Sequence, residues 1–418
     1  MVAIQGCTVT SDRKSQVMAR PTPLIPPPQT DIPLGDGRSL RIGAQVGRGS
    51  MATVYRGLIE GPFGLGRTVA VKVFDVIASD EHEAVLSALA SAAQRSACVR
   101  HPNVLRVEDF GLIGPAQPYA VEELVEGRSL ARFAAYAARH DERFPLDLAL
   151  FIGAEVAEAL AGARLACSPD GVRLGIVHGE LSPFDVLLSW HGEVKVGDFG
   201  VTASARAASS VRSVRALARR VRALAPEVAR GQLGDARSDV FSLGVMLREM
   251  MVGPRFPRMV SDAEALVWAR DGVVHQSLFE PQLPQALQAI LTRAVAREPA
   301  HRYPHAGALG YELRRVALAM GVGDGRAFLR TALSRSFGDD RADDGEEEVT
   351  GEMRLPPPAP APRPSGVAMV DRFARLRGQD AVRVPSPDDS ETFALESGTV
   401  LVAGATAPED DDDEAGEG

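Results

Sequence analysis

The spacing of apolar residues changes near residue 128, and this change limits the folds that the chain can adopt. Before it, segments such as RIGAQVGRG, TVYRGLI and RTVAVKVFDVI show strand patterns rich in β-branched residues, with one helical stretch over 80–98. After it, LDLALFIGAEVAEALAGARLA and its neighbours carry apolar residues at helical spacing, around a short hairpin at 184–200. The pattern predicts an α+β protein in which a small β-rich lobe precedes a larger helical lobe.

The two ends of the chain lack any such periodic pattern. Residues 1–37 contain PTPLIPPPQTDIP, and residues 336–418 contain DDRADDGEEE, PPPAPAPRP and EDDDDEAGEG, with 21 acidic residues against 7 arginines. Segments of this composition bury too little apolar surface to fold alone, so we expect both ends to be disordered. The folded part is then predicted at 38–320, with its β-rich lobe at about 38–125 and its helical lobe at about 126–320.

Charge and cysteine content exclude several classes of protein. The formal net charge is -9, and the chain has no dense basic stripe interleaved with aromatic residues, so nucleic acid is not an expected partner. It has no run of 18 apolar residues and no apolar signal peptide, so no membrane span is expected. The three cysteines, Cys7, Cys98 and Cys167, are far apart, which favours a reducing compartment and a cytoplasmic protein. The oligomeric state and any protein partner or substrate stay unknown.

A glycine-rich turn and a lysine lie close together in the β-rich lobe. Gly47 and Gly49 belong to the segment GRGSMATV, which ends at Val54. The segment VAVK follows, and it contains Ala70 and Lys72, the latter eighteen residues after Val54. Glycines allow a backbone to approach phosphate groups closely. A plain hairpin turn and a surface lysine are the alternatives for each feature alone. Because the chain has only three lysines against 43 arginines, however, the position of a lysine is informative.

Several short motifs follow in a fixed order along the helical part. They are His178-Gly179-Glu180, Asp185, Asp198-Phe199-Gly200, Ala225-Pro226-Glu227, Ser238-Asp239 and Arg302. Each motif alone is weak evidence for a protein family, but the whole set in this order and at this spacing is highly specific. Together with the glycine turn and Lys72, it resembles the bacterial Ser/Thr protein kinase family over roughly residues 39–320.

The resemblance implies a two-lobed protein-kinase fold that binds ATP with Mg²⁺. The turn at 47–52 would cover the phosphates, and Lys72 would pair with them. The adenine would lie against apolar and hinge positions of this sequence, namely Val54, Ala70, Glu123 and Val125.

The resemblance also implies roles for the acidic motifs. Asp198 would hold Mg²⁺, Asp185 matches an Asn that holds a second Mg²⁺, and Glu180 matches the catalytic Asp. Residues of the helical lobe would brace the site: Asp239 would anchor the catalytic loop, His178 would stack with Phe199, and Glu227 would form a buried ion pair with Arg302.

Five positions near the chemistry depart from the family pattern. Glu180 replaces Asp, and its extra methylene displaces the carboxylate by about 1 Å, which can cost about 100-fold or about 2.7 kcal/mol. Gly179 replaces an Arg that reads an activation-loop phosphate, and Asp185 replaces the metal-binding Asn. Ala92 stands where a helix glutamate should pair with Lys72. Arg220 stands where a small residue should seat the peptide substrate.

Glu122 is a further departure, because it aligns with a position behind the adenine that is usually apolar. One hypothesis is that Glu122 reaches Lys72 and substitutes for the missing helix carboxylate. The alternative is an alignment shift by one residue that leaves Glu122 elsewhere on the hinge.

Residues that build the fold and bind nucleotide are mostly kept, whereas those that move the proton and seat the peptide are altered. This contrast favours a signalling pseudokinase that binds ATP with Mg²⁺ and transfers phosphate weakly or not at all. An active Ser/Thr protein kinase that uses Glu180 as its base is the alternative. A small-molecule kinase and a scaffold that binds no nucleotide are less favoured, the former because the Ala-Pro-Glu segment and Asp239 are typical of protein kinases.

Overall fold

The computed structural model describes most of the chain between residues 31 and 338. Within that span it leaves out residues 50, 76–81, 115–116, 141, 202–219, 258 and 275–281. The chain divides into two compact units, residues 1–361 and 362–418, and the second lies wholly outside the described residues. The predicted disordered ends lie outside them too, except for a few residues next to the folded part.

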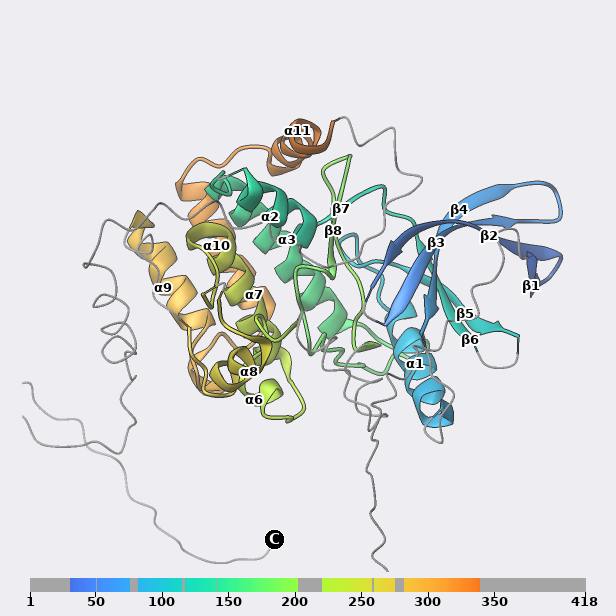
Figure 1. Cartoon of the computed structure of the whole chain (residues 1–418), viewed down its shortest axis with the longest axis horizontal. Helices are drawn as coiled ribbons and strands as arrows, with labels where there is room; N and C mark the ends of the chain where they lie inside the picture. Colours follow the sequence, from blue (N-terminus) through green and yellow to red (C-terminus); the bar gives the residue numbers. More distant parts are fainter. Residues whose placement is uncertain are drawn as a thin grey trace, which may run out of the picture. The chain divides into compact units, whose positions relative to one another are not determined.

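An antiparallel sheet in the order β1-β2-β3-β4-β6-β5 forms the N-terminal lobe, drawn in blue to cyan in Figure 1. Because side chains alternate along a strand, Tyr55 and Ile59 of β3 enter the apolar core of this lobe, while Val54 and Arg56 face the other way. The lobe comprises β1 (Asp31–Gly35), β2 (Arg38–Arg48), β3 (Ala52–Glu60), β4 (Gly66–Phe74), helix α1 (His82–Ala97), β5 (Val107–Ile113) and β6 (Gln117–Glu123).

The first strand begins earlier than the sequence predicted. Residues 31–35 form β1, which pairs with β2 from Asp31 opposite Arg41, so the predicted disorder of 1–37 is wrong over its last residues. Ile32 and Leu34 alternate toward the core of the lobe, and Pro33 is tolerated because β1 is an edge strand. The turn that follows has positive φ at Gly35, Asp36 and Gly37, which makes a tight hairpin possible.

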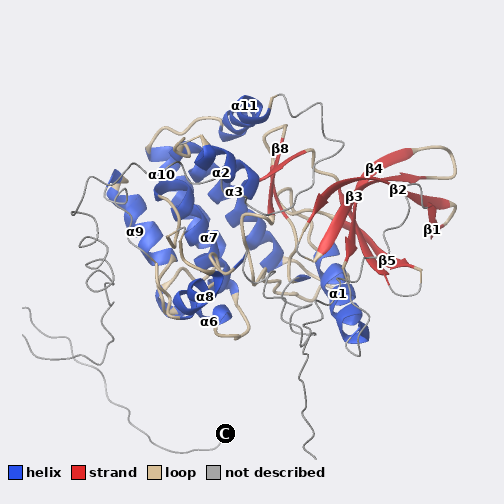
Figure 2. Cartoon of the chain, viewed as in Figure 1, coloured by secondary structure: helices blue, strands red, loops and turns tan. Residues whose placement is uncertain are grey.

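Helices form the C-terminal lobe, shown in blue in Figure 2. α3 lies at its centre and packs against α7 and α10, which explains why its apolar residues recur on nearly every face. The elements are β7 (Gly127–Ser129), α2 (Leu130–Arg139), α3 (Leu146–Leu165), β8 (Val186–Ser189), β9 (Val194–Val196), α6 (Pro226–Ala229), α7 (Ala236–Val252), α8 (Asp262–Arg270), α9 (Gln285–Ala294), η2 (Pro299–His301), α10 (Ala306–Ala319) and α11 (Gly325–Phe337).

The last helix, α11, extends the folded part beyond the predicted end at residue 320. Its buried face is formed by Leu329, Leu333 and Phe337, which recur at a spacing of four residues, and the Phe337 ring lies 5.0 Å from that of Tyr136 in α2. The Asp324 side chain caps the first turn by accepting a hydrogen bond from Ala327 N. The predicted start of the disordered tail at 336 is therefore slightly too early.

No described helix combines the length and the apolar character that a membrane crossing requires. The predicted cytoplasmic location stays a prediction.

A three-stranded sheet, β7-β8-β9, connects the hinge after β6 to the helical lobe. At Gly127 the chain approaches β8 so closely that an added Cβ would lie 1.9 Å from the Leu188 carbonyl oxygen. Only glycine fits there without displacing backbone.

We therefore expect Gly127→Ala to lower the free energy of unfolding by about 2 kcal/mol, because a rigid backbone atom must move to admit the methyl group. Urea unfolding of the two proteins measures the change. Gly323→Ala is the matched control, since a Cβ there meets no atom within 4 Å. Equal midpoints for wild type and Gly127→Ala would contradict the close approach.

Candidate functional site

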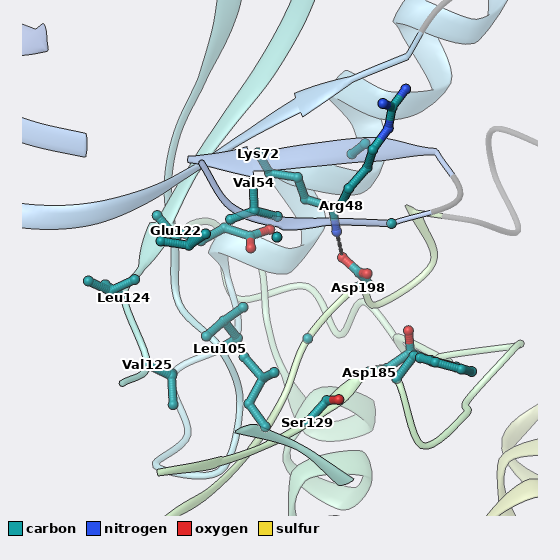
Figure 3. Close-up of a pocket in the computed structure, with 18 of the residues that line it drawn as sticks. Arg48, Val54, Lys72, Leu105, Glu122, Leu124, Val125, Ser129, Asp185 and Asp198 are labelled. Carbon is teal, nitrogen blue, oxygen red and sulfur yellow. Dashed lines mark hydrogen bonds and ion pairs between the residues drawn. The ribbon is translucent and has the colours of Figure 1, made fainter. Parts of the chain in front are cut away.

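A cavity of about 360 Å³ lies where the sheet faces the helical lobe, and Figure 3 shows its lining. The β2-β3 turn and β4 form one wall, the segment after β6 forms the back, and the loops around β8 and β9 form the other wall. Nearly all predicted site residues line it, namely Gly47, Gly49, Val54, Ala70, Lys72, Glu123, Val125, Asp185 and Asp198. Residues that are far apart in the sequence thus meet in one cavity, as the motif order predicted.

The glycine turn closes tightly over this cavity. The Gly49 N–H donates to the Ala52 carbonyl at 2.7 Å, and a Cβ on Gly49 would lie 3.3 Å from the same oxygen. Val54 pairs with Lys72 across β3 and β4, so the turn and the lysine belong to adjacent strands. The lining next to the turn includes the small apolar side chains of Ala52 and Val54, which suit a planar, partly apolar ligand.

Lys72 of β4 forms an ion pair with Asp198, which follows β9, and this pair joins the two lobes (Figure 3). Burial acts to lower the pKa of Lys72, but the charges of Asp198, Glu122 and Asp185 and the hydrogen bond to Asp198 together raise that pKa. Burial likewise acts to raise the pKa of Asp198, and the Lys72 charge and hydrogen bond lower it overall. Asp198 also has φ of 62°, a left-handed conformation that is uncommon outside glycine and that clusters at functional sites.

Glu122 of β6 lies opposite Ala70 in the sheet and lines the cavity, so it occupies the predicted position rather than a shifted one. The hypothesis that Glu122 reaches Lys72 stays a hypothesis: among the described residues the ammonium forms its ion pair with Asp198, and the Glu122 charge is one of the influences that raise the pKa of Lys72. Ala92, where the family has a glutamate, is buried in α1. Burial raises the pKa of Glu122 to about 7, and the charge of Lys72 only partly offsets that rise.

Glu123 braces the hinge with its side chain. Its carboxylate accepts hydrogen bonds from Lys195 Nζ of β9 at 3.0 and 3.1 Å and from the backbone N–H of Arg106 at 2.9 Å. The Glu123 N–H itself donates to the Arg106 carbonyl. This residue therefore ties the end of β6 to β9, and Val125 lines the cavity beyond it. The sequence pattern did not foresee the pair with Lys195.

A side chain of α7 holds the loop that carries Glu180. Asp239 accepts hydrogen bonds from the backbone N–H groups of His178 and Gly179 at 2.9 and 2.8 Å, which confirms its predicted anchoring contact. The His178 and Phe199 rings lie 5.0 Å apart at an interplanar angle of 52°, so the predicted neighbours meet, but tilted and not stacked. Glu180 itself is only 1% exposed and is not among the residues that line the cavity. The predicted base therefore lies beneath the cavity wall.

Arg220 reaches into the site from the segment before α6. Its Nη1 and Nη2 donate to the two carboxylate oxygens of Asp185 at 2.8 and 2.7 Å, and Nη1 also donates to the Glu180 carbonyl at 2.8 Å. Ser182 donates to the same Asp185 carboxylate from both its hydroxyl and its N–H. In the sequence, Arg220 aligns with the position that seats a peptide substrate, and its contact with Asp185 was not predicted.

The cleft, the motif order and the anchored loop coincide with a family match. The family model described as "Protein tyrosine and serine/threonine kinase" matches residues 40–309. The chain belongs to the protein kinase family. Its kinase domain thus comprises both lobes described above, with the sheet and hinge on one side of the cleft and the anchored loop on the other.

Relatives of this kinase domain are bacterial. The tyrosine-protein kinase MasK of Myxococcus xanthus is 28% identical over 342 residues, which cover 79% of this chain and 51% of MasK. The probable serine/threonine-protein kinase PknB of Lactococcus lactis is 32% identical over 63% of this chain and 39% of its own length. This chain thus spans about half or less of these relatives. A crystal structure of the Mycobacterium tuberculosis PknI kinase domain shares 23% identity at a TM-score of 0.48, covering 66% of this chain and 95% of that one.

The acidic residues of the kinase domain fit the family's metal ions only in part. Carboxylate oxygens are suitable ligands for Mg²⁺, and Asp198 lines the cavity with a depressed pKa. Both oxygens of Asp185, however, already accept hydrogen bonds from Arg220. In the described part of the chain, no cluster of three or more His, Cys, Asp or Glu residues is arranged to hold a metal ion. The site as built fits a cation at Asp198 and does not fit a second one at Asp185.

Proposed function

We propose that this kinase domain binds ATP in the cleft between its lobes as part of a signalling protein and transfers phosphate weakly or not at all. The observation that carries the proposal is the bidentate contact between Arg220 and Asp185. It occupies a carboxylate that the catalytic arrangement of the family needs for metal, in a cleft whose nucleotide-binding residues are otherwise retained.

The nucleotide side of the cleft supports ATP as the ligand. Val54 and Ala70 offer apolar contact to a purine ring, and the turn through Gly47 and Gly49 can cover phosphates with backbone N–H groups. Lys72 supplies a positive charge for the same phosphates. Mg²⁺ held by Asp198 would neutralise phosphate charge when bound.

The phosphotransfer side supports weak turnover. Glu180 is one methylene longer than the family aspartate and is buried away from the cavity, and a displacement of about 1 Å already costs roughly 100-fold in rate. Arg220 also crosses the site at the position where a small residue would seat a peptide. Within the described residues, an acceptor hydroxyl would thus meet a buried base and an arginine at its docking position.

An active protein kinase is the second candidate, because Glu180 keeps a carboxylate and positioning carries most of the rate in phosphoryl transfer. Relatives are named as serine/threonine and as tyrosine kinases, so the acceptor could be either kind of hydroxyl.

Binding and transfer are tested together on the purified full chain. We expect ATP to raise the melting temperature of the wild type and not that of Lys72→Met. We also expect transfer of labelled γ-phosphate to generic protein substrates to stay at the level of Lys72→Met, with either Mg²⁺ or Mn²⁺. Transfer clearly above that level, and lost in Glu180→Gln, would establish the second candidate instead. No thermal response to ATP would contradict nucleotide binding altogether.

A further inference from the structure

We propose that Arg220 is a resident cation of the nucleotide site, so that a nucleoside polyphosphate binds this cleft without a divalent metal ion at Asp185. The inference rests on the proposed nucleotide binding and adds a role for a residue that the family pattern places elsewhere.

Arg220 lies at the cavity and forms an ion pair with Asp185. Arg220 is 8% exposed and lines the same cavity as Lys72 and Asp198, and the Asp185 side chain that its guanidinium contacts is 1% exposed. Both Asp185 oxygens are engaged by Arg220 in a planar, two-bond contact. This geometry is the strongest form of a charge-assisted pair, and arginine adopts it more readily than lysine.

Two ion pairs between lining residues lie at the cleft. Lys72 pairs with Asp198 on one side, and Arg220 pairs with Asp185 on the other. The carboxylates of Asp198 and Asp185, which would otherwise repel a polyphosphate, are thus each paired with a cationic side chain of the protein. The Arg220 charge also acts beyond its partner: burial acts to raise the pKa of Asp198, and the Arg220 charge helps the stronger Lys72 contacts to lower it.

Arg220 also keeps capacity to bind an anion. A guanidinium has five N–H groups. Three of them serve the contacts with Asp185 and the Glu180 carbonyl, and the remaining two, on Nε and Nη2, make no hydrogen bond to any residue that the structure describes. A phosphate oxygen that enters the cavity can accept from them, so one side chain neutralises Asp185 and contacts the ligand.

A metal ion at Asp185 would compete with this arrangement. It would have to displace Arg220 and leave a buried guanidinium without its carboxylate, which is strongly unfavourable. The ion pair between Arg220 and Asp185 therefore disfavours a second metal ion at Asp185. Arg220 itself supplies the positive charge that such an ion would bring.

The test is the affinity of the full chain for a fluorescent ATP analogue, titrated in EDTA and again in millimolar Mg²⁺. We expect the wild type to bind the analogue in EDTA, and any gain in Mg²⁺ to come from a cation at Asp198. For Arg220→Gln we expect a loss of about tenfold or more in EDTA, which corresponds to removal of a charge-assisted contact worth about 1.4 kcal/mol. Mg²⁺ should restore most of that loss, because Asp185 is then free to bind it.

Arg222→Gln is the matched control: Arg222 lies two residues away, contacts the Val260 carbonyl at 3.4 Å and does not line the cavity. Its affinities should equal the wild type in both buffers. If Arg220→Gln unfolds, Arg220→Gln combined with Asp185→Asn removes the unpaired carboxylate. This double variant should then bind more weakly than wild type in both EDTA and Mg²⁺, because it has lost the cation and the metal ligand together.

The outcomes separate the inference from the proposed function. Affinity in EDTA that is unchanged in both Arg220 variants would overturn the role of Arg220 and leave nucleotide binding intact. Absence of binding in both buffers would contradict the proposed function, and the inference with it.

Discussion

Replacing Arg302 by methionine should lower the free energy of unfolding by about 3 to 5 kcal/mol, because it leaves a buried carboxylate without its partner. The Arg302 side chain is 0% exposed and donates to both oxygens of Glu227 at 2.7 and 2.9 Å. It also donates to the carbonyls of Arg237, Ala296 and Arg297. These contacts join η2 to α6 and to the start of α7, and the predicted ion pair is thereby confirmed.

Urea unfolding followed by circular dichroism measures this loss. Arg314→Met is the matched control, because its ion pair with Glu158 at 2.9 Å is half exposed and should contribute less than about 1 kcal/mol. Adding Glu227→Gln to Arg302→Met should recover part of the stability by removing the stranded charge. Similar midpoints for Arg302→Met and Arg314→Met would show that the buried pair contributes little.

Replacing Glu122 by glutamine should stabilise the folded state in a pH-dependent way. The pKa of Glu122 is raised from 4.5 to about 7 by burial, so between these values the folded protein binds a proton that the unfolded chain has lost. The stability of the wild type therefore falls as pH rises through this window, by about 3 kcal/mol at most. Glutamine has no proton to lose, so the advantage of the variant is small near pH 4.5 and largest above pH 7.

Unfolding free energies of wild type and Glu122→Gln at pH 5 and pH 8, without nucleotide, provide the measurement. Glu126→Gln is a suitable control, since the Glu126 side chain is half exposed and pairs with Arg56 at the surface. A difference between wild type and Glu122→Gln that stays constant across this range would mean that Glu122 keeps its charge throughout. In that case the charge of Lys72 would have a larger effect on the pKa of Glu122 than burial has.

Most of the fold followed from local patterns in the sequence. Strand alternation and helical spacing placed the two lobes, since burial of one face is a local requirement of each element. The two errors at the boundaries have local causes as well. β1 was hidden by the proline-rich composition around Pro33, although Ile32 and Leu34 alternate correctly. α11 was missed although Asp324 caps it and Leu329 and Leu333 share its buried face.

The site was predicted as a set of positions but not as a set of contacts. Motif order placed Lys72, Asp198 and Asp185 at one cavity, because each motif has a fixed place on its strand or loop. The ion pair of Lys72 is with Asp198, and the contact of Arg220 with Asp185 was not expected.

The sequence by itself determined the family, the order of the lobes and the residues that share the cleft, because periodicity, glycine turns and motif spacing are local properties of the chain. Only the tertiary structure decided which charges pair. Lys72 has several carboxylates near it and binds the one that the packing of β4 against the loop after β9 brings within reach. Arg220 finds Asp185 because the chain before α6 folds back under the catalytic loop. Such choices depend on distances of an ångström and on burial, which no local pattern encodes.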